Sequence, residues 1–259
     1  MGEGNYFQGS YIYAIIESKG HPELLEFGNL GIGDRGDRVY TVNFKDLAAV
    51  VSSSPVEKLP VSRDNTLAHQ KVLEKVMEKF TILPVRFCTI AENEKDIQEK
   101  VLKARYQEFK NLLFEMKDKV ELGVRAVWAN IEKIFGEILE ENKDIEQLKE
   151  KIAKESSLAK RHAGMIKIGE MVQKALGEKK EKEAREILAV FKPLSVETRV
   201  NKVYGDRNIL KAAFLVKETR EKEFDQKINQ LEKELGGRTS LKYFGPVPPY
   251  NFVEVVVTW

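Results

Sequence analysis

Few side chains in this chain have the type and spacing that catalysis or metal binding needs. The histidines His21, His69 and His162 stand far apart, and the single cysteine, Cys88, cannot form a CxxC pair. Zinc sites usually draw such ligands from short, regular spacings. His69 has no nucleophile or orienting carboxylate placed by local spacing, which is typical of a structural histidine. We therefore expect a protein that is not an enzyme, with no catalytic residue, no metal and no cofactor.

One glycine pattern, GIGDRG at residues 31–36, has the GxGxxG spacing of dinucleotide-binding loops. That motif needs a strand before it and a helix that opens on its last glycine. Here a strand pattern, VYTVNF at residues 39–44, follows instead. The pattern indicates a loop whose glycines adopt positive φ angles, and not a nucleotide site.

Arg86 is a charged residue within an apolar run, TILPVRFCT at residues 81–89. It points to the opposite face from its neighbours Val85 and Phe87, because side chains alternate along a strand. Pro84 has no N–H for a ladder, so it requires an edge, a bulge or a strand end. We expect this run to be the strand that forms the spine of the first domain and on which both neighbouring helices pack. Arg86 itself is either half of a structural ion pair, which is the commoner case, or part of a ligand site.

A second unusual stretch, GPVPPYNF at residues 245–252, has three prolines within four positions. Such a run favours a stiff, extended path. The aromatic residues Phe244, Tyr250 and Phe252 flank the prolines. The stretch is either an ordered tail that packs on its own protein or a segment that binds a partner. We predict that residues 252–257, which follow it, pair with a strand of the first domain; the alternative is an edge strand of the second sheet.

The elements that carry these residues form two α+β halves. The first half reads as β-β-β-α-β-α, with strand patterns at 11–17, 39–44, 47–52 and 81–89 and helical patterns near 64–80 and 93–116. The second half reads as β-α-β-β-α-β, with strands at 121–128, 194–204, 209–216 and 238–244 and helices at 131–192 and 221–235. This second order is the split βαβ, or ferredoxin-like, arrangement.

The long helical stretch at 131–192 is interrupted by glycines, each of which costs about 1 kcal/mol relative to alanine in a helix. We therefore expect a bent helix or a helical hairpin there, with weak points at Gly164, Gly169 and Gly177. The resulting domain prediction is a tag remnant at 1–10, an N-terminal α+β domain at 11–119, and a C-terminal ferredoxin-like domain at 120–259. The second domain carries the extended helical insertion and the GPVPPYNF tail.

Composition narrows the partners that we expect. The 43 basic and 41 acidic residues are interleaved and give a net charge of +2, which provides no electrostatic footprint for nucleic acid. The 259 residues contain no apolar run long enough to cross a bilayer. A single cysteine fits a reducing compartment. We therefore expect a cytoplasmic protein with neither nucleic acid nor lipid membrane as a partner.

Two motifs resemble those of one protein family. The segment FGPVPPYNF at 244–252 resembles the C-terminal GPxPPYSF signature of the gas vesicle GvpF/GvpL family, and TILPVRF at 81–87 is similar to its LPVRFG segment. Weaker similarities follow in family order: the glycine-rich loop at 28–33, DLAAVVS at 46–52, the helical His69 and ELGV at 121–124. The motif positions are Leu83, Pro84, Arg86, Phe87, Gly245, Pro246, Pro248, Pro249, Tyr250 and Phe252.

Three residues depart from the family pattern. Cys88 stands where glycine is frequent, Val247 where a bulkier residue is common, and Asn251 where serine is usual. The departures leave the choice between the F and L branches open.

The resemblance implies a function without catalysis. Members of this family are minor gas vesicle components, thought to bind the hydrophobic shell protein GvpA and to keep it from aggregating during nucleation and assembly. The resemblance thus implies a chaperone-like structural protein at the gas vesicle, with GvpA-type subunits and other accessory gas vesicle proteins as partners. It also implies two α+β domains, the second a modified ferredoxin-like one. The alternative is a small-ligand-binding regulatory module, which would need a buried polar pocket around Arg86.

Overall fold

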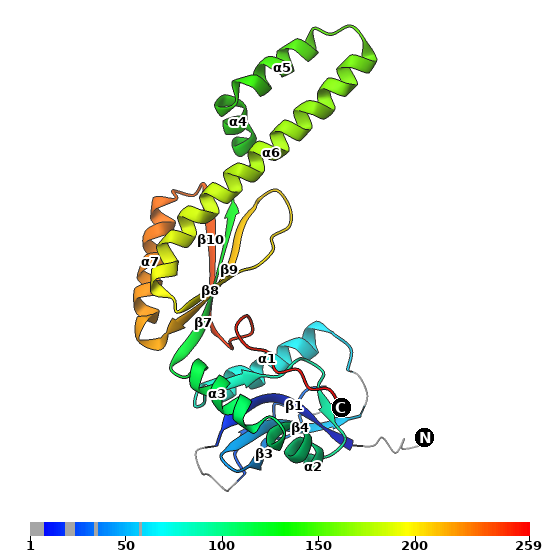
Figure 1. Ribbon diagram of the computed structural model, residues 1–259, viewed down its shortest axis with the longest axis vertical. Helices are drawn as coiled ribbons and strands as arrows, with labels where there is room; N and C mark the ends of the chain where they lie inside the picture. The colour runs from blue at the N-terminus through cyan, green and yellow to red at the C-terminus, as the bar shows by residue number, and fades with distance from the viewer. Residues whose placement is uncertain (1–7, 19–23, 34–35, 57–58) are drawn as a thin grey trace. The chain divides into compact units, whose positions relative to one another are not determined.

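The computed structural model describes residues 8–18, 24–33, 36–56 and 59–259. By its contacts the chain divides into two compact units (Figure 1). The first unit extends to Glu121 and also includes Pro246–Trp259, and the second unit is Leu122–Gly245. The sequence placed the tail in the second domain. In the structure the tail belongs with the first unit, because its backbone and side chains bond to residues there.

The first unit is built around β1 (Gln8–Glu17), a long and almost fully buried strand. The sheet order is β2-β3-β4-β1-β5, with β6 also paired to β1. The other strands are β2 (Glu26–Gly28), β3 (Val39–Phe44), β4 (Leu47–Pro55), β5 (Ile82–Pro84) and β6 (Ile90–Ala91). The sequence predicts that the strand within residues 81–89 is the spine of this domain, with both neighbouring helices packed on it. The helices at Arg63–Met77 and Tyr106–Met116 do contact this strand, but the strand is not the spine of the sheet. Only three of those residues form β5, and it lies at the end of the sheet order.

The first strand also begins earlier than predicted. Gln8, Gly9 and Ser10, which the sequence assigned to a tag remnant, pair with residues 53–55 of β4. The rest of that predicted remnant, residues 1–7, lies outside the described residues. Residues 8–10 are thus part of the sheet, because their backbone extends the β1–β4 ladder.

Helix α1 (Arg63–Met77) begins where the sequence predicts it. The side chain of Ser62 caps it by accepting a hydrogen bond from the Asn65 N–H, and Val72, Leu73 and Val76 join the buried cluster on the sheet. The helix predicted from Asn93 is also present, but it has three parts: α2 (Glu94–Asp96), the π-helix η1 (Ile97–Lys103) and α3 (Tyr106–Met116).

The second unit contains a four-stranded sheet in the order β10-β7-β9-β8. Its strands are β7 (Lys119–Trp128), β8 (Glu197–Val200), β9 (Asn208–Lys217) and β10 (Thr239–Val247). Its helices are α4 (Ile131–Glu141), α5 (Lys143–Ala153), α6 (Leu158–Phe191) and α7 (Glu221–Glu234), with short 3₁₀ turns η2 (Lys192–Leu194) and η3 (Glu218–Arg220). The predicted element order β-α-β-β-α-β is confirmed.

The helical insertion forms a hairpin, as one of the two predicted alternatives proposed (Figure 1). Its breaks lie at Asn142 and at residues 154–157, and not at the glycines. Helix α6 runs without interruption through all three of them. At Gly164 a Cβ atom would lie 2.4 Å from Ile152 Cδ1, so this glycine allows α5 to approach α6 closely.

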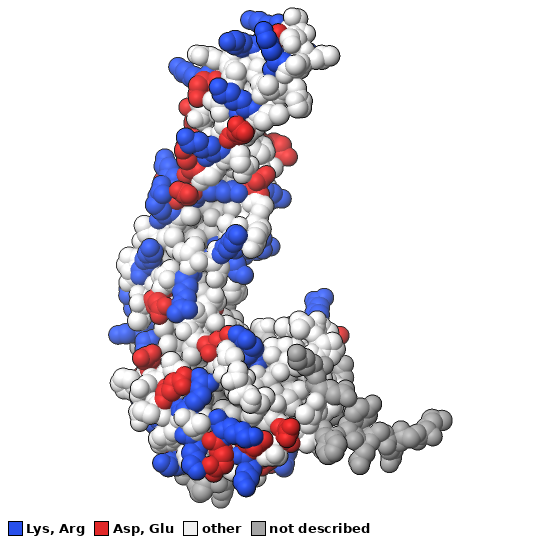
Figure 2. Space-filling view, turned by 45° about the vertical axis from the view of Figure 1, so that its right-hand side comes forward, with Lys and Arg blue, Asp and Glu red and all other residues white. Residues whose placement is uncertain are grey.

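Figure 2 shows basic and acidic side chains interleaved along the helical hairpin, as the sequence predicts. Helix α6 is the longest helix described, and it too carries many charges. Within the described part of the chain, no helix combines the length and the apolar character that a membrane span requires.

Candidate functional site

The two unusual sequence motifs lie side by side in the first unit. Val85 and Val255 form a parallel β-bridge. The Val255 N–H donates to the Pro84 carbonyl at 3.0 Å, and the Arg86 N–H donates to the Val255 carbonyl at 3.0 Å. The prediction that residues 252–257 pair with the first domain is confirmed at this point. The tail is not a full strand, because only Val255 forms a bridge.

Pro84 explains why the contact lies where it does. It is the last residue of β5 and pairs with Ala14 of β1. Proline has no N–H, so it suits an edge strand or a strand end. Its carbonyl oxygen remains available, and it accepts the hydrogen bond from the Val255 N–H of the tail. Leu83 is fully buried in β5, and Phe87 packs edge-on against Tyr11 and His69, with ring centroids 6.3 and 5.7 Å apart.

Arg86 forms the structural ion pair that the sequence analysis considered the commoner case. Its Nε and Nη2 atoms donate to the two carboxylate oxygens of Glu254, at 3.4 and 3.0 Å. The hydrogen bond with Glu254 raises the pKa of Arg86 above its ordinary value. The Arg86 side chain is 56% exposed, which rules out a buried pocket at this residue. Exposed pairs of this kind contribute little to stability.

Glu121 and Asn251 make the second contact between tail and body. Glu121 is 1% exposed. Its Oε2 accepts a hydrogen bond from the Asn251 N–H at 2.8 Å, and its Oε1 accepts one from Asn251 Nδ2 at 2.5 Å. Glu121 is not among the site residues predicted from the sequence. The available signal was an acidic residue at the start of an apolar strand pattern, because such a residue needs a partner when it is buried.

The prolines lead into a turn. Pro248 and Pro249 are buried, and the Pro249 carbonyl accepts hydrogen bonds from the N–H groups of Phe252 and Val253 at 3.0 and 2.9 Å. The stiff extended path expected from the sequence therefore ends at residue 249. Beyond the turn, Arg105 Nη1 donates to the Val256 carbonyl at 2.9 Å. Gly245 and Pro246 lie in the last part of β10.

A buried polar cluster lies beside this junction. The Tyr11 hydroxyl bonds to His69 Nδ1 at 2.9 Å and accepts a hydrogen bond from the Cys88 N–H at 2.9 Å. The Tyr13 hydroxyl bonds to Ser52 Oγ at 2.8 Å. Burial lowers the pKa of His69 to about 4, so its ring is neutral at pH 7. This is the structural histidine that the sequence predicts.

The other candidates from the sequence do not join this cluster. His162 is an exposed residue of α6, and His21 lies outside the described residues. The GxGxxG stretch precedes β3, and Gly33 and Gly36 have φ angles of 90° and 64°, as expected for a loop. Among the residues that the structure describes, no group of three or more His, Cys, Asp or Glu side chains is arranged to hold a metal ion.

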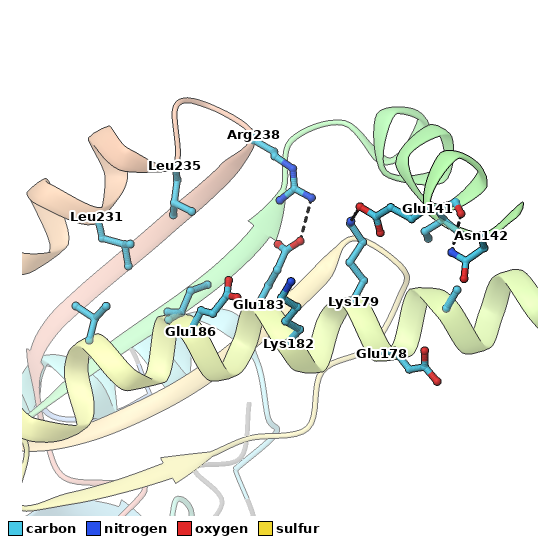
Figure 3. A pocket seen from close by; sticks show the side chains of 14 residues that line it. Glu141, Asn142, Glu178, Lys179, Lys182, Glu183, Glu186, Leu231, Leu235 and Arg238 are labelled. Atoms are coloured by element: carbon cyan, nitrogen blue, oxygen red, sulfur yellow. Dashed lines mark hydrogen bonds and ion pairs between the residues drawn. The ribbon is translucent and has the colours of Figure 1, made fainter.

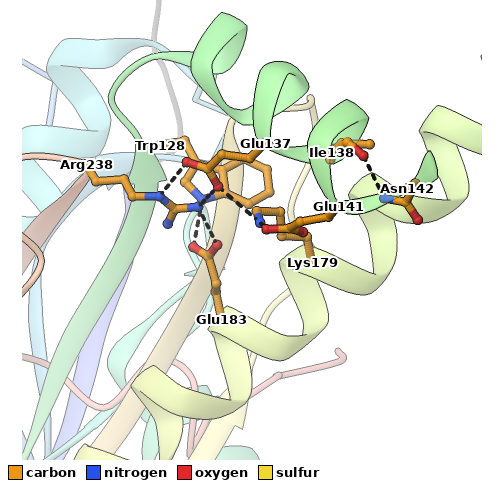
Figure 4. A network of polar contacts seen from close by, with 8 residues as sticks. All are labelled: Trp128, Glu137, Ile138, Glu141, Asn142, Lys179, Glu183 and Arg238. Atoms are coloured by element: carbon orange, nitrogen blue, oxygen red, sulfur yellow. Dashed lines mark hydrogen bonds and ion pairs between the residues drawn. The ribbon is translucent and has the colours of Figure 1, made fainter. Parts of the chain in front are cut away.

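The second unit contains a cluster of charged residues at one corner (Figure 4). Arg238 donates to both oxygens of Glu137, at 3.0 and 2.7 Å, and to Glu183 at 2.9 Å. Trp128 Nε1 donates to the other oxygen of Glu183 at 2.7 Å, and Lys179 pairs with Glu137 at 3.0 Å. The hydrogen bond from Arg238 lowers the pKa of Glu137 to about 2.

A cavity of about 760 Å³ adjoins this cluster. Figure 3 shows the charged side chains of α6, including Lys179 and Glu183, on one side and Leu231 and Leu235 on the other. The lining contains acidic and basic groups in similar number, and Arg238 is already bound by carboxylates. The cavity therefore offers no excess of charge that would select one kind of small ligand.

The chain is similar to known proteins over nearly its whole length. A sequence model of the family described as "Gas vesicle synthesis protein GvpL/GvpF" matches residues 9–254. Gas vesicle protein F of Streptomyces sp. (strain CB03234) is 30% identical over 245 residues, which cover 95% of this chain and 99% of that protein. Gas vesicle protein F of Microcystis aeruginosa is 24% identical, covering 96% of this chain and 99% of the relative.

Solved structures have the same fold. The crystal structure of the gas vesicle protein GvpF from Anabaena sp. PCC7120 matches with a TM-score of 0.83 at 23% identity, over 96% of this chain and 99% of that chain. The GvpF structure from Microcystis aeruginosa matches with a TM-score of 0.76 at 23% identity, over 94% and 98%.

The backbone conformation of Cys88, which stands where the family often has glycine, predicts how substitutions at this position change stability. Its φ angle is 64°, a conformation that costs a residue other than glycine about 1–2 kcal/mol. Its sulfur accepts a hydrogen bond from the Leu59 N–H at 3.2 Å. Cys88→Gly should therefore change the unfolding free energy of the first unit by less than about 1 kcal/mol. Cys88→Val should lower it by about 1–3 kcal/mol, because β-branched residues resist positive φ. Equal stability of the two variants in chemical denaturation would contradict this account.

His69 predicts a pH dependence of stability. Its pKa is about 4 in the folded chain and 6.5 when unperturbed. Between these values the unfolded chain binds a proton that the folded chain does not, so stability falls as pH is lowered from 6.5 to 4. The full loss is about 3 kcal/mol. We expect His69→Gln to flatten this part of the profile and His162→Gln, at an exposed site, to leave it unchanged. An unaltered slope in His69→Gln would show that other groups cause the loss.

Proposed function

Because the chain belongs to the GvpL/GvpF family of gas vesicle synthesis proteins, we propose that it acts at the gas vesicle as a chaperone-like accessory protein. It binds shell subunits of the GvpA type and keeps them from aggregating during nucleation and assembly. The activity is binding, without a chemical step. The observation that carries the proposal is the family match over residues 9–254, together with an exposed apolar surface on the helical hairpin.

The hairpin surface consists of Leu158, Met165 and Ile166, which we call the hairpin stripe. These side chains of α6 are 75%, 63% and 53% exposed. Leu158 and Met165 are seven residues apart and so share one face of the helix. Helix α5 packs on a different side of α6, where Ile152 meets Gly164. A very hydrophobic shell subunit needs such a surface to cover it before assembly.

Surface charge supports the same interpretation. Lys160, Arg161 and Lys167 are exposed around the stripe, and Figure 2 shows basic side chains over this end of the hairpin. Charged groups beside an apolar stripe keep the free protein from self-associating through it. The binding energy itself comes mainly from apolar burial, so added salt weakens the binding only slightly.

The alternative, a small-ligand-binding module, needs a buried polar pocket around Arg86. The exposure of Arg86 and its pair with Glu254 speak against that alternative. The cavity beside Lys179 and Arg238 is elsewhere, and its charged groups bind one another.

The test is a pull-down of GvpA-type shell protein at low and high salt, with light scattering to follow shell-protein aggregation. We expect the unchanged protein to bind at both salt concentrations and to delay aggregation. Substituting Leu158, Met165 and Ile166 together by Gln, which keeps good helix propensity, should weaken binding at least about tenfold. The matched control is Phe114→Gln, which removes a side chain of the first unit that is 79% exposed.

The two parts of the proposal fail differently. Full binding by the triple variant would place the binding surface outside the hairpin stripe but leave the function intact. Absence of binding at both salt concentrations, together with normal vesicles in a deletion strain, would contradict the function itself.

A further inference from the structure

Strand β8 is an open edge of the second sheet. In the order β10-β7-β9-β8 it has β9 on one side, and no described strand pairs with its other side. An edge strand presents unpaired N–H and C=O groups that can bind another strand. Proteins usually protect such edges with lysine, proline or a bulge.

Two other strands at sheet ends, β10 and β5, carry such protective residues. Strand β10, at the opposite edge of the same sheet, contains Lys242 and Pro246. Strand β5 ends with Pro84, and the tail covers it there. Strand β8 has neither lysine nor proline; its residues are Glu197, Thr198, Arg199 and Val200.

The register shows which backbone groups of β8 point outward. The Asn201 N–H donates to the Lys211 carbonyl of β9 at 2.8 Å, and Thr198 and Val200 are opposite Phe214 and Ala212. Hydrogen-bonded and non-hydrogen-bonded pairs alternate along an antiparallel ladder. The backbone groups of Thr198 and Val200 therefore point away from β9.

The side chains along this edge are complementary to themselves. Val196 and Val200 are 56% and 58% exposed. Between them Glu197 and Arg199 form an exposed ion pair at 2.9 Å. On each side of Thr198 a charged residue is followed by a valine. The charged residue is acidic on one side and basic on the other.

We propose that β8 pairs in antiparallel fashion with β8 of a second copy of this chain, with Thr198 opposite Thr198 on a two-fold axis. Val196 then lies opposite Val200, and Glu197 lies opposite Arg199 of the second copy. Each charge meets its opposite, and the two exposed valines cover each other. The two sheets join into one continuous sheet across the axis.

The backbone geometry fits this pairing. The outward groups at Thr198 form the central hydrogen-bonded pair, and the Val200 N–H reaches the Val196 carbonyl of the second copy. The Val196 N–H already donates to Leu215 and takes no part. Glu197 and Arg199 fall at non-hydrogen-bonded positions, where opposing side chains lie closest. This dimer does not depend on the proposed binding of shell protein.

Charge exchange gives a test that separates association from folding. In Glu197→Arg both charged positions are basic, and in Arg199→Glu both are acidic, so each variant repels its own copy. We expect each to dimerise at least about tenfold more weakly than the unchanged protein. The double variant E197R/R199E should recover the dimer. An equimolar mixture of the two single variants should form heterodimers. This result would show that each single variant is folded and that only its pairing with itself is weakened.

The measurement is analytical ultracentrifugation over protein concentrations up to about 1 mM. Thr198→Pro removes an outward N–H without removing a bond to β9 and should abolish the dimer, whereas Thr198→Val keeps that N–H and should retain it. A monomer at every concentration would overturn the proposal. Pairing of β8 with a strand of a different protein would not rescue it. A dimer that is unchanged in both single charge variants and in Thr198→Pro would place the contact elsewhere and would equally overturn it.

Discussion

The buried carboxyl group of Glu121 is the constraint on which the arrangement of the chain depends. A carboxyl group that is almost fully removed from water costs several kcal/mol unless hydrogen bonds satisfy it. Asn251 supplies a donor to each of its oxygens. These two residues are 130 positions apart, so the first unit is complete only after the whole second unit has been synthesised and the tail has returned. Contacts between residues so far apart in the sequence form late, and they lower the folding rate.

The residues that carry the family resemblance serve this return of the tail. Pro84 offers a carbonyl to Val255, Arg86 pairs with Glu254, and the prolines at 248 and 249 are buried before the turn that directs the chain toward β5. The motifs are thus the two sides of one internal contact. The partner surfaces that we propose lie elsewhere, on the outer part of α6 and along β8.

The sequence predicts the helices and strands of this chain better than it predicts where each element and side chain lies in the fold. Apolar periodicity locates the helices of the first unit to within a few residues, and the β-α-β-β-α-β order of the second unit follows from pattern alone. The sequence predicts that Arg86 alternates with Val85 and Phe87 along one strand, yet β5 ends at Pro84, two residues before Arg86. The low helix propensity of glycine predicts weak points in α6, but the helix continues through all three glycines. At Gly164 the missing side chain allows Ile152 to pack closely. The partners Glu121 and Asn251 could not be matched from one sequence, because no local pattern links them.

The central claim is that the hydrogen bonds between Asn251 and Glu121 hold the tail in the first unit. Native-state hydrogen exchange in Asn251→Ala tests it most directly, because the Arg86 and Val255 amides report the contact between tail and β5. The account predicts that both amides lose protection by about 1–3 kcal/mol, the usual cost of leaving a buried hydrogen-bonding group unsatisfied. The β1–β4 ladder should lose less. Unchanged protection of Arg86 and Val255 in this variant would contradict the account.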